Sequence, residues 1–235
     1  MAADLPSSKG PPVYAPPPPV FSWTGVYIGG QVGYEWGRTT FATVNPVTGV
    51  IAGGFPAIDE QGVVGGGHVG YNYQLGGLGL GFGGFLVGIE GDVNGASYTG
   101  SELLGVTTLR ERTPVDASIR GRVGITFDRF LVYGTDGVAF GSIRESLTTP
   151  IFSGSATTGR VGWTVGGGLE YAIDNNWSVR AEYRYTDYGR FNESFATVRL
   201  PVTLRYHPTD NRVQVGFSYK FDEAPPPAPP VVAKY

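Results

Sequence analysis

Two histidines, His68 and His207, are the side chains best suited to general acid–base chemistry near neutral pH. Nucleophilic catalysis would also need a hydroxyl beside such a base and a carboxylate to orient it. The sequence gives His68 no obvious serine and carboxylate partner, and the segment His207-Pro208-Thr209-Asp210 predicts a loop. We therefore expect His68 to make structural hydrogen bonds, and we do not expect an enzyme.

Metal, cofactor and nucleic-acid chemistry find little support in the composition. The chain of 235 residues has no cysteine, so no Cys or Cys/His zinc pattern exists, and its one methionine is Met1. Haem ligation in the predicted loops would depend on one histidine. The net charge is −3 without a block of Lys or Arg, which argues against nucleic acid as a partner. We expect no cofactor and no bound metal.

Thirteen charged residues alternate with apolar residues along the chain. Seven are basic and six acidic, so they could pair almost completely if they met in one space. We predict that they form a charge network inside the protein. The thirteen residues are Glu35, Glu90, Asp92, Arg120, Arg122, Asp136, Arg160, Glu170, Arg180, Glu182, Arg184, Arg212 and Lys220.

Period-two alternation of this kind predicts β-strands with one apolar and one polar face. In the run 130–141 both faces are apolar or glycine, and only Asp136 indicates which face is polar. This predicts that Asp136 lies on the polar face. An even number of runs favours an all-β, antiparallel, up-and-down barrel of eight strands. The eight runs span residues 26–36, 68–75, 85–94, 118–127, 130–141, 160–173, 177–186 and 212–221.

The connections between runs are alternately short and long. The short ones are 76–84, 128–129 and 174–176, and the long ones are 37–62, 95–117, 142–159 and 187–210. Transmembrane barrels have short periplasmic turns and long extracellular loops, and this predicts that both termini are periplasmic. Proline-rich segments at 1–20 and 222–235 are expected to be periplasmic spacers flanking a barrel domain at 21–221. Residues 1–4 lack the features of a signal peptide, so we take the chain as a mature protein with an initiator methionine.

The distribution of charge between the two faces predicts which face meets lipid. A soluble barrel of the lipocalin kind has a polar outside, and it could not bury thirteen charges while exposing tryptophan and tyrosine to water. Trp36, Trp163 and Trp177 lie near strand ends, as aromatic girdles at membrane interfaces do. An eight-stranded barrel leaves an interior that side chains can fill, so we expect a plugged lumen, with a narrow ion passage as the alternative.

Several short motifs are distributed along almost the whole chain. They are Ala3-Asp4-Leu5-Pro6, Phe21-Ser22-Trp23-Thr24-Gly25-Val26-Tyr27-Ile28-Gly29-Gly30, Gly88-Ile89-Glu90-Gly91-Asp92, Tyr133-Gly134-Thr135, 163–171 and 180–185. In order and spacing the chain resembles the porin-family outer-membrane barrels of alphaproteobacteria, whose membrane part is similar to the OmpA-type domain. The resemblance implies a role in envelope integrity and surface antigenicity, in contact with outer-membrane lipid and lipopolysaccharide.

The last run resembles the C-terminal signal that the barrel-assembly machinery reads. The residues that match the signal are Gln214, Gly216, Tyr219 and Phe221. Fourteen residues follow Phe221, whereas barrels of this kind usually end there. The extension predicts altered assembly or a periplasmic tether.

The N-terminus carries a further implication of the resemblance. Some family members begin with Ala-Asp, and L,D-transpeptidases join the alanine amine to peptidoglycan. Ala3 is the matching position here, provided that Met1 and Ala2 do not belong to the mature chain. The alternative is a leader without chemistry. For the whole protein we therefore predict a structural barrel, with a narrow porin and a surface protein that binds ligands or host molecules through its loops as alternatives, and an outer-membrane enzyme as a rival that the residues do not favour.

Overall fold

Alternating apolar and polar residues build long antiparallel β-strands throughout the part of the chain that the structure describes. This computed structural model describes residues 21–44, 50–76, 83–97, 99–104, 107–149, 152–195 and 202–221. The strands are β1 (Gly25–Val44), β2 (Ile51–Leu75), β3 (Gly84–Ala96), β4 (Thr99–Leu104), β5 (Thr107–Phe127), β6 (Phe130–Thr149), β7 (Phe152–Ala172), β8 (Trp177–Asp187), β9 (Phe191–Phe195) and β10 (Val202–Lys220).

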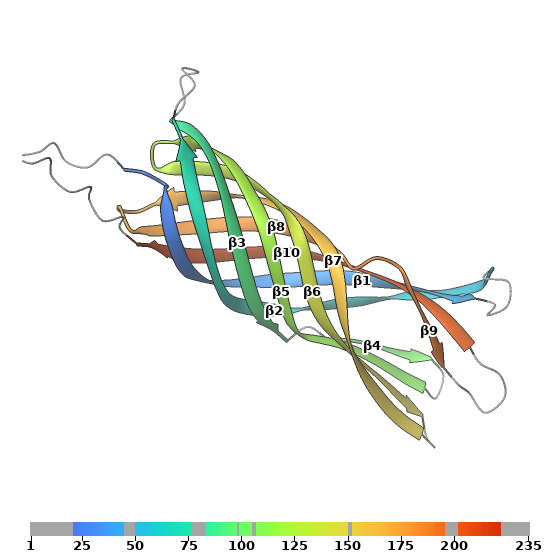
Figure 1. The fold of residues 1–235 in the computed structure, drawn as a ribbon. Coiled ribbons are helices and arrows are strands. Elements are labelled where there is room, and N and C mark those ends of the chain that lie inside the picture. Colours follow the sequence, from blue (N-terminus) through green and yellow to red (C-terminus); the bar gives the residue numbers. More distant parts are fainter. Residues whose placement is uncertain are drawn as a thin grey trace, which may run out of the picture.

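The strands close into a barrel because β1 pairs with both β2 and β10 (Figure 1). β4 follows β3 along the same partner, β5, and β9 follows β8 along β10. The ten segments therefore occupy eight positions around the barrel. The predicted eight-stranded antiparallel barrel is confirmed.

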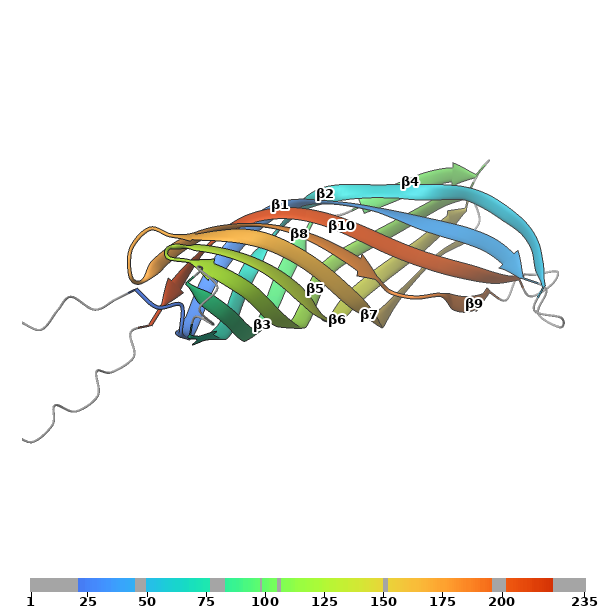
Figure 2. The same cartoon turned by 90° about the horizontal axis from the view of Figure 1, so that it is seen from above.

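The predicted long loops are wrong over much of their length, because the strands continue into them. β1 extends to Val44 and β2 begins at Ile51, so most of 37–62 is strand, and the same holds for 95–117, 142–159 and 187–210. These extensions project beyond the barrel at the end opposite the short turns, which we name the long-strand end (Figure 2). They carry mixed residues on both faces, so the alternation that marks a lipid-facing strand is missing.

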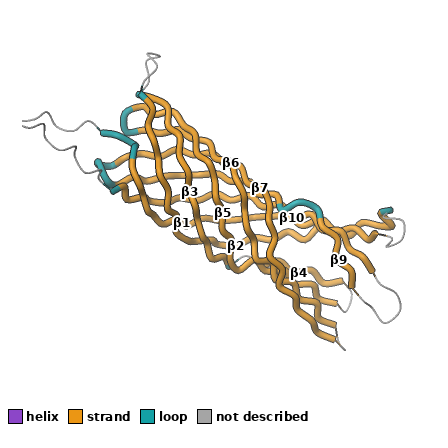
Figure 3. Tube along the Cα trace, in the orientation of Figure 1, coloured by secondary structure: helices purple, strands orange, loops and turns teal. Residues whose placement is uncertain are grey.

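The other end, which we name the short-turn end, has compact connections (Figure 3). Between β5 and β6, Phe127 pairs with Phe130, and Asp128 takes a φ of 53°, which aspartate tolerates better than most residues. Between β7 and β8, the Asp174 carboxylate accepts hydrogen bonds from the backbone N–H groups of Asn176 at 2.8 Å and Trp177 at 2.7 Å. Both turns match predicted connections. Residues 77–82, in the third one, lie outside the described residues.

The barrel is polar inside and apolar outside. Arg120 and Arg122 on β5 are 0% and 1% exposed, whereas Val123 beside them is 62% exposed. Aromatic side chains form two exposed girdles. The short-turn girdle contains Tyr73, Phe127, Phe130, Tyr171, Trp177 and Phe221, and the long-strand girdle contains Tyr34, Trp36, Phe140, Trp163 and Tyr183. An apolar exterior over a closed hydrogen-bonded ring suits lipid rather than water.

The predicted phase is correct for every run except 130–141, where the assignment of Asp136 was wrong. Asp136 is exposed on the outer face of β6, while Tyr133 and Thr135 point inward. Directly paired residues lie on the same face of a sheet, and Asp136 pairs with Gly121, which faces outward between Arg120 and Arg122. The register therefore fixes the orientation that one carboxylate could not.

Candidate functional site in the barrel interior

Five buried arginines dominate the interior of the described barrel. Arg120 and Arg122 come from β5, Arg180 and Arg184 from β8, and Arg212 from β10. Alternate residues of a strand lie on one face, so each strand delivers its cations to the same space. Each guanidinium lies within 4.0 Å of at least one carboxylate.

Arg120 is the centre of the largest cluster. Its guanidinium lies 2.5 Å from a Glu90 oxygen, 2.7 Å from Glu182 and 3.2 Å from Asp92. Arg180 approaches the second oxygen of Glu90 at 2.5 Å, and Arg184 lies 3.1 Å from Asp92. The carboxylates come from β3 and β8, so the cluster joins opposite walls of the barrel.

Arg122 and two tyrosines extend this cluster toward the short-turn end. Arg122 forms an ion pair with Glu170 and lies 3.8 Å above the centre of the Tyr133 ring. The Tyr27 hydroxyl donates to Glu90 at 2.8 Å, and the Tyr133 hydroxyl donates to Glu182 at 3.0 Å. The phenol groups thus satisfy carboxylate oxygens that also face arginines.

A second cluster surrounds Arg212, nearer the long-strand end. Arg212 lies 2.6 Å from Glu35 and 2.9 Å from Asp116. The Asn94 amide donates to Asp116 at 3.1 Å and to Asp92 at 2.7 Å, which connects this cluster to the first. Side chains from most strands therefore form one continuous plug.

His68 has hydrogen-bond partners that its neighbourhood in the sequence could not reveal. Gln31 donates its amide to Asn94 at 2.7 Å, so its carbonyl oxygen must accept from His68 Nδ1, at 2.5 Å. His68 Nε2 then accepts from the Ser218 hydroxyl at 2.9 Å. The sequence offered His68 no obvious serine and carboxylate partner; the structure supplies the serine, Ser218, and Gln31 in place of a carboxylate. The order of groups matches an activated serine, but His68 and Ser218 are 3% and 2% exposed.

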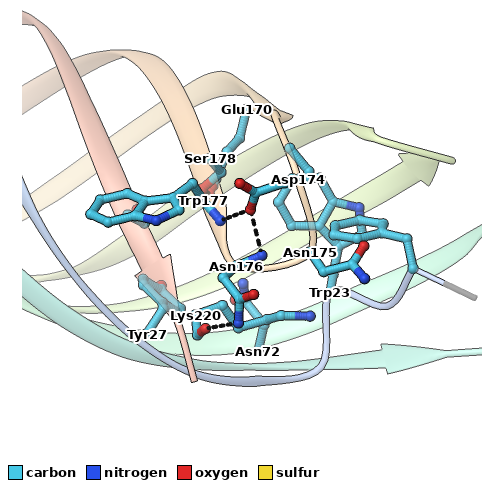
Figure 4. A pocket seen from close by; sticks show the side chains of 13 residues that line it. Trp23, Tyr27, Asn72, Glu170, Asp174, Asn175, Asn176, Trp177, Ser178 and Lys220 are labelled. Carbon is cyan, nitrogen blue, oxygen red and sulfur yellow. Dashed lines mark hydrogen bonds between the residues drawn. The ribbon is translucent and has the colours of Figure 1, made fainter. Parts of the chain in front are cut away.

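A cavity near Ser218 shows how little free space exists at the short-turn end. It has a volume of about 20 Å³ and is lined by Trp23, Tyr27, Asn72 and Lys220, among others (Figure 4). The Asn72 side-chain oxygen, which is buried, has no hydrogen-bond partner among the described residues. This space suits one water molecule bound to Asn72 and is too small for a substrate. The geometry supports a hydrogen-bonding role for His68.

The segment before β1 closes the barrel at the short-turn end. Trp23 packs with Leu86, Leu131, Tyr133 and Ala172 and is 4% exposed. Its backbone N–H donates to the Gln74 side chain at 2.9 Å, and its indole N–H donates to the Asp128 carbonyl at 3.2 Å. We name residues 21–24 the aromatic latch.

Three predicted network residues lie outside the two clusters. Asp136 faces outward, as described above. Arg160 lies 3.7 Å from the centre of the Phe191 ring, toward the long-strand end. Lys220 donates to the Ser22 carbonyl and lies 5.1 Å from the centre of the Phe21 ring, so it holds the latch.

The residues expected to form the assembly signal occupy the end of β10 and the position after it. Gln214 points inward and donates to Glu182 at 3.2 Å. Gly216 also faces inward, where a Cβ would lie 2.7 Å from the Gly30 carbonyl. The Tyr219 and Phe221 rings meet edge to face at 5.3 Å. Their role in assembly stays a prediction, and Ala3 lies outside the described residues.

Sequence reasoning missed several members of the interior. Asp116 continues the alternation of Ser118, Arg120 and Arg122, so extending that run backward would have found it. Tyr133 was missed because Asp136 set the wrong phase. Trp23 precedes the first alternating run, and no periodicity marks it.

Comparisons with known proteins agree with this architecture. A family model described as an outer membrane protein beta-barrel domain matches residues 14–221. The 31 kDa outer-membrane immunogenic protein of Brucella melitensis biotype 1 is 36% identical over 94% of this chain and 93% of its own length. The 22 kDa outer membrane protein of Rhizobium leguminosarum bv. viciae is 34% identical over 74% of this chain and 68% of its own.

A solved structure shows the same fold. The outer membrane protein OprG of Pseudomonas aeruginosa aligns with a TM-score of 0.59 over 85% of this chain and 97% of its own. The two sequences are 14% identical, so the likeness concerns the fold alone.

Proposed function

The chain belongs to the outer membrane protein beta-barrel domain family, and we propose that it is a structural barrel that supports envelope integrity and is joined to peptidoglycan through its N-terminus. The filled interior is the observation that carries the structural part of the proposal. Arginine–carboxylate clusters cross the barrel, and the aromatic latch covers the short-turn end. These buried contacts occupy the interior around Arg120 and Arg212, and this supports a structural barrel over a channel or an enzyme.

The first and last residues of the barrel domain lie at the same end of the barrel, and this favours a periplasmic tether. Phe21 and Phe221 both lie at the short-turn end, where the Phe221 N–H donates to the Val26 carbonyl at 2.9 Å and Lys220 holds Ser22. In this family's usual orientation, that end faces the periplasm. Residues 4–20, if they form polyproline II at about 3.1 Å per residue, would span roughly 50 Å.

The latch would then serve as the anchor point of the tether. Force applied to the N-terminal segment would meet Trp23 in its apolar cluster and the hydrogen bonds of Ser22 and Trp23 before it reached β1. Barrel and wall would be held together through buried contacts rather than through a free strand end.

Mass spectrometry of muramidase-digested cell wall tests the covalent link. We expect an N-terminal peptide that begins at Ala3 and carries a muropeptide, and we expect it to disappear in a strain without L,D-transpeptidases. Detection of only the unmodified N-terminal peptide would contradict the tether.

A chain lacking residues 3–20 should also fail to restore detergent resistance to a strain from which the protein has been deleted, whereas full rescue by that chain would show that the tether is unnecessary.

A second candidate function is surface recognition at the long-strand end. The strand extensions project beyond the barrel, and the Brucella relative is named as immunogenic. Antibody binding to intact cells, before and after protease treatment, would test whether these extensions are displayed outside.

A further inference from the structure

Asp136 places an unpartnered carboxyl group on the lipid-facing surface of β6. It is exposed there, and no hydrogen bond or ion pair to it occurs in the described part of the chain. Ionisable side chains in the apolar part of a membrane are expensive and usually find a partner. We therefore expect the Asp136 carboxyl group to contact a group outside its own barrel.

Asp136 lies within the apolar band of the outer surface. It lies between Phe130 of the short-turn girdle and Phe140 of the long-strand girdle on the same strand. At about 3.3 Å per residue and a tilt of about 40°, it sits roughly 15 Å above Phe130 in an apolar band about 25 Å tall. This position is inside the band on the side of the long-strand girdle, whose Trp163 pairs with Val138.

Glycines lie beside the carboxyl group on the outer face of β5 and β6, whereas its partner on the neighbouring strand β7 is Val165 (Figure 1). Gly121 is paired with Asp136, and Gly134 precedes it by two residues. A Cβ at Gly121 or Gly134 would meet only one backbone oxygen, at 3.7 Å and 3.8 Å. By contrast, a Cβ at the inward Gly137 would lie 2.1 Å from the Ile119 carbonyl. Packing inside the barrel thus requires Gly137, but it does not require the outward glycines.

From these observations we infer that Asp136 and the outward glycines around it form an intramembrane contact surface for a second copy of this chain. Small residues allow close approach of backbones in lipid, where association depends on packing and polar contacts. We name this surface, formed by Gly121, Gly134, Asp136 and Val138, the Asp136 face.

A twofold contact satisfies the carboxyl group better than any other contact between two copies. In the described strands, no Lys, Arg or His points outward between the two girdles, so no other patch of the barrel offers a cation at this depth. An isologous dimer brings each residue close to its own copy. One protonated Asp136 can then donate a hydrogen bond to the carboxylate of the other.

Cysteine crosslinking in isolated outer membranes tests the contact, because the natural chain has no cysteine. Val138→Cys lies on the Asp136 face, and Val179→Cys on β8 is the control, since the two valines are 43% and 44% exposed. Oxidation should give a species of twice the monomer mass for Val138→Cys and at least tenfold less of it for Val179→Cys.

Two second-site changes test the roles of the carboxyl group and of the small residues. Asp136→Leu and Gly134→Leu, each added to Val138→Cys, should reduce crosslinking at least tenfold, whereas Gly65→Leu on the outer face of β2 should leave it unchanged. Protease resistance of each barrel verifies folding. The inference is overturned by equal crosslinking of Val138→Cys and Val179→Cys, by crosslinking that survives Asp136→Leu, or by a product whose mass shows a different protein.

Discussion

At the residue scale, the interior ion pairs should contribute to stability far more than pairs on the surface. Arg120→Ala removes a fully buried cation and leaves Glu90 and Glu182 with one arginine fewer each, so the buried cluster has an excess negative charge. This should lower the free energy of unfolding by about 3–5 kcal/mol. Arg38→Ala is the control, because Arg38 and Asp59 are 3.7 Å apart with side chains 68% and 81% exposed, and it should cost less than about 1 kcal/mol. Urea titration of the barrel in lipid vesicles measures both, and equal effects would contradict the proposed network.

Two neighbouring glycines give a second comparison of inward and outward positions. A Cβ at the inward Gly66 would lie 2.1 Å from the Val93 carbonyl, whereas a Cβ at the outward Gly65 would approach the Gln31 carbonyl at 3.5 Å. We expect Gly66→Ala to destabilise the barrel by about 1–3 kcal/mol through overpacking and Gly65→Ala to be tolerated. The same urea titration compares the two variants. An unchanged free energy of unfolding in Gly66→Ala would show that the interior can accommodate an added methyl group.

At the element scale, the aromatic latch should behave as part of the core although it is not a strand. Trp23→Ala should lower the free energy of unfolding by about 3–5 kcal/mol, since Trp23 is buried against Leu86 and Tyr133. Trp36→Ala serves as the control, because Trp36 is 41% exposed in the long-strand girdle. If Trp23→Ala costs no more than Trp36→Ala, the latch does not hold the barrel end.

The turn between β7 and β8 should be sensitive to acid. The backbone N–H groups of Trp177 and Asn176 hold the pKa of the Asp174 carboxyl below its usual range. A lowered pKa stabilises the turn above the ordinary value of about 3.9, and this stabilisation is lost as the pH falls through the folded value. Hydrogen-exchange protection of the Trp177 amide, corrected for intrinsic rates, should therefore fall below about pH 4.

Two variants separate the charge of Asp174 from its hydrogen bonds. Asp174→Asn keeps a side-chain oxygen as acceptor, so protection of the Trp177 amide should no longer depend on acid. Asp174→Ala should remove the protection at every pH. Acid-dependent protection in Asp174→Asn would assign the effect to another group.

Alternation predicted the elements well wherever one face meets lipid, as in β8, where Trp177, Val179 and Ala181 face outward. It missed the strand extensions, because a strand with water on both sides has no need to alternate. It also could not bring together residues distant in sequence, such as His68 and Ser218, which are 150 positions apart. Asp136 was assigned to the wrong face because it was the only polar residue that indicated a phase in its run, and the pairing of its strand with β5 fixes the opposite phase.

At the scale of the whole molecule, the fold inverts the usual distribution of residues and turns the interior into a polar plug. Glu90 contacts Arg120 and Arg180, Glu182 contacts Arg120 and Arg184, and Asn94 connects these groups to Asp116. Removal of one arginine leaves an excess negative charge in the buried network, so the network favours a single arrangement of side chains. A barrel filled in this way suits a structural element of the envelope better than a channel.

Single-channel recording in planar bilayers tests this central claim most directly. The purified chain, with insertion verified independently by protease protection, should give no conductance steps above the bare bilayer over the range of applied voltages. Reproducible openings with a current proportional to voltage would contradict a plugged interior and would favour the narrow-porin alternative.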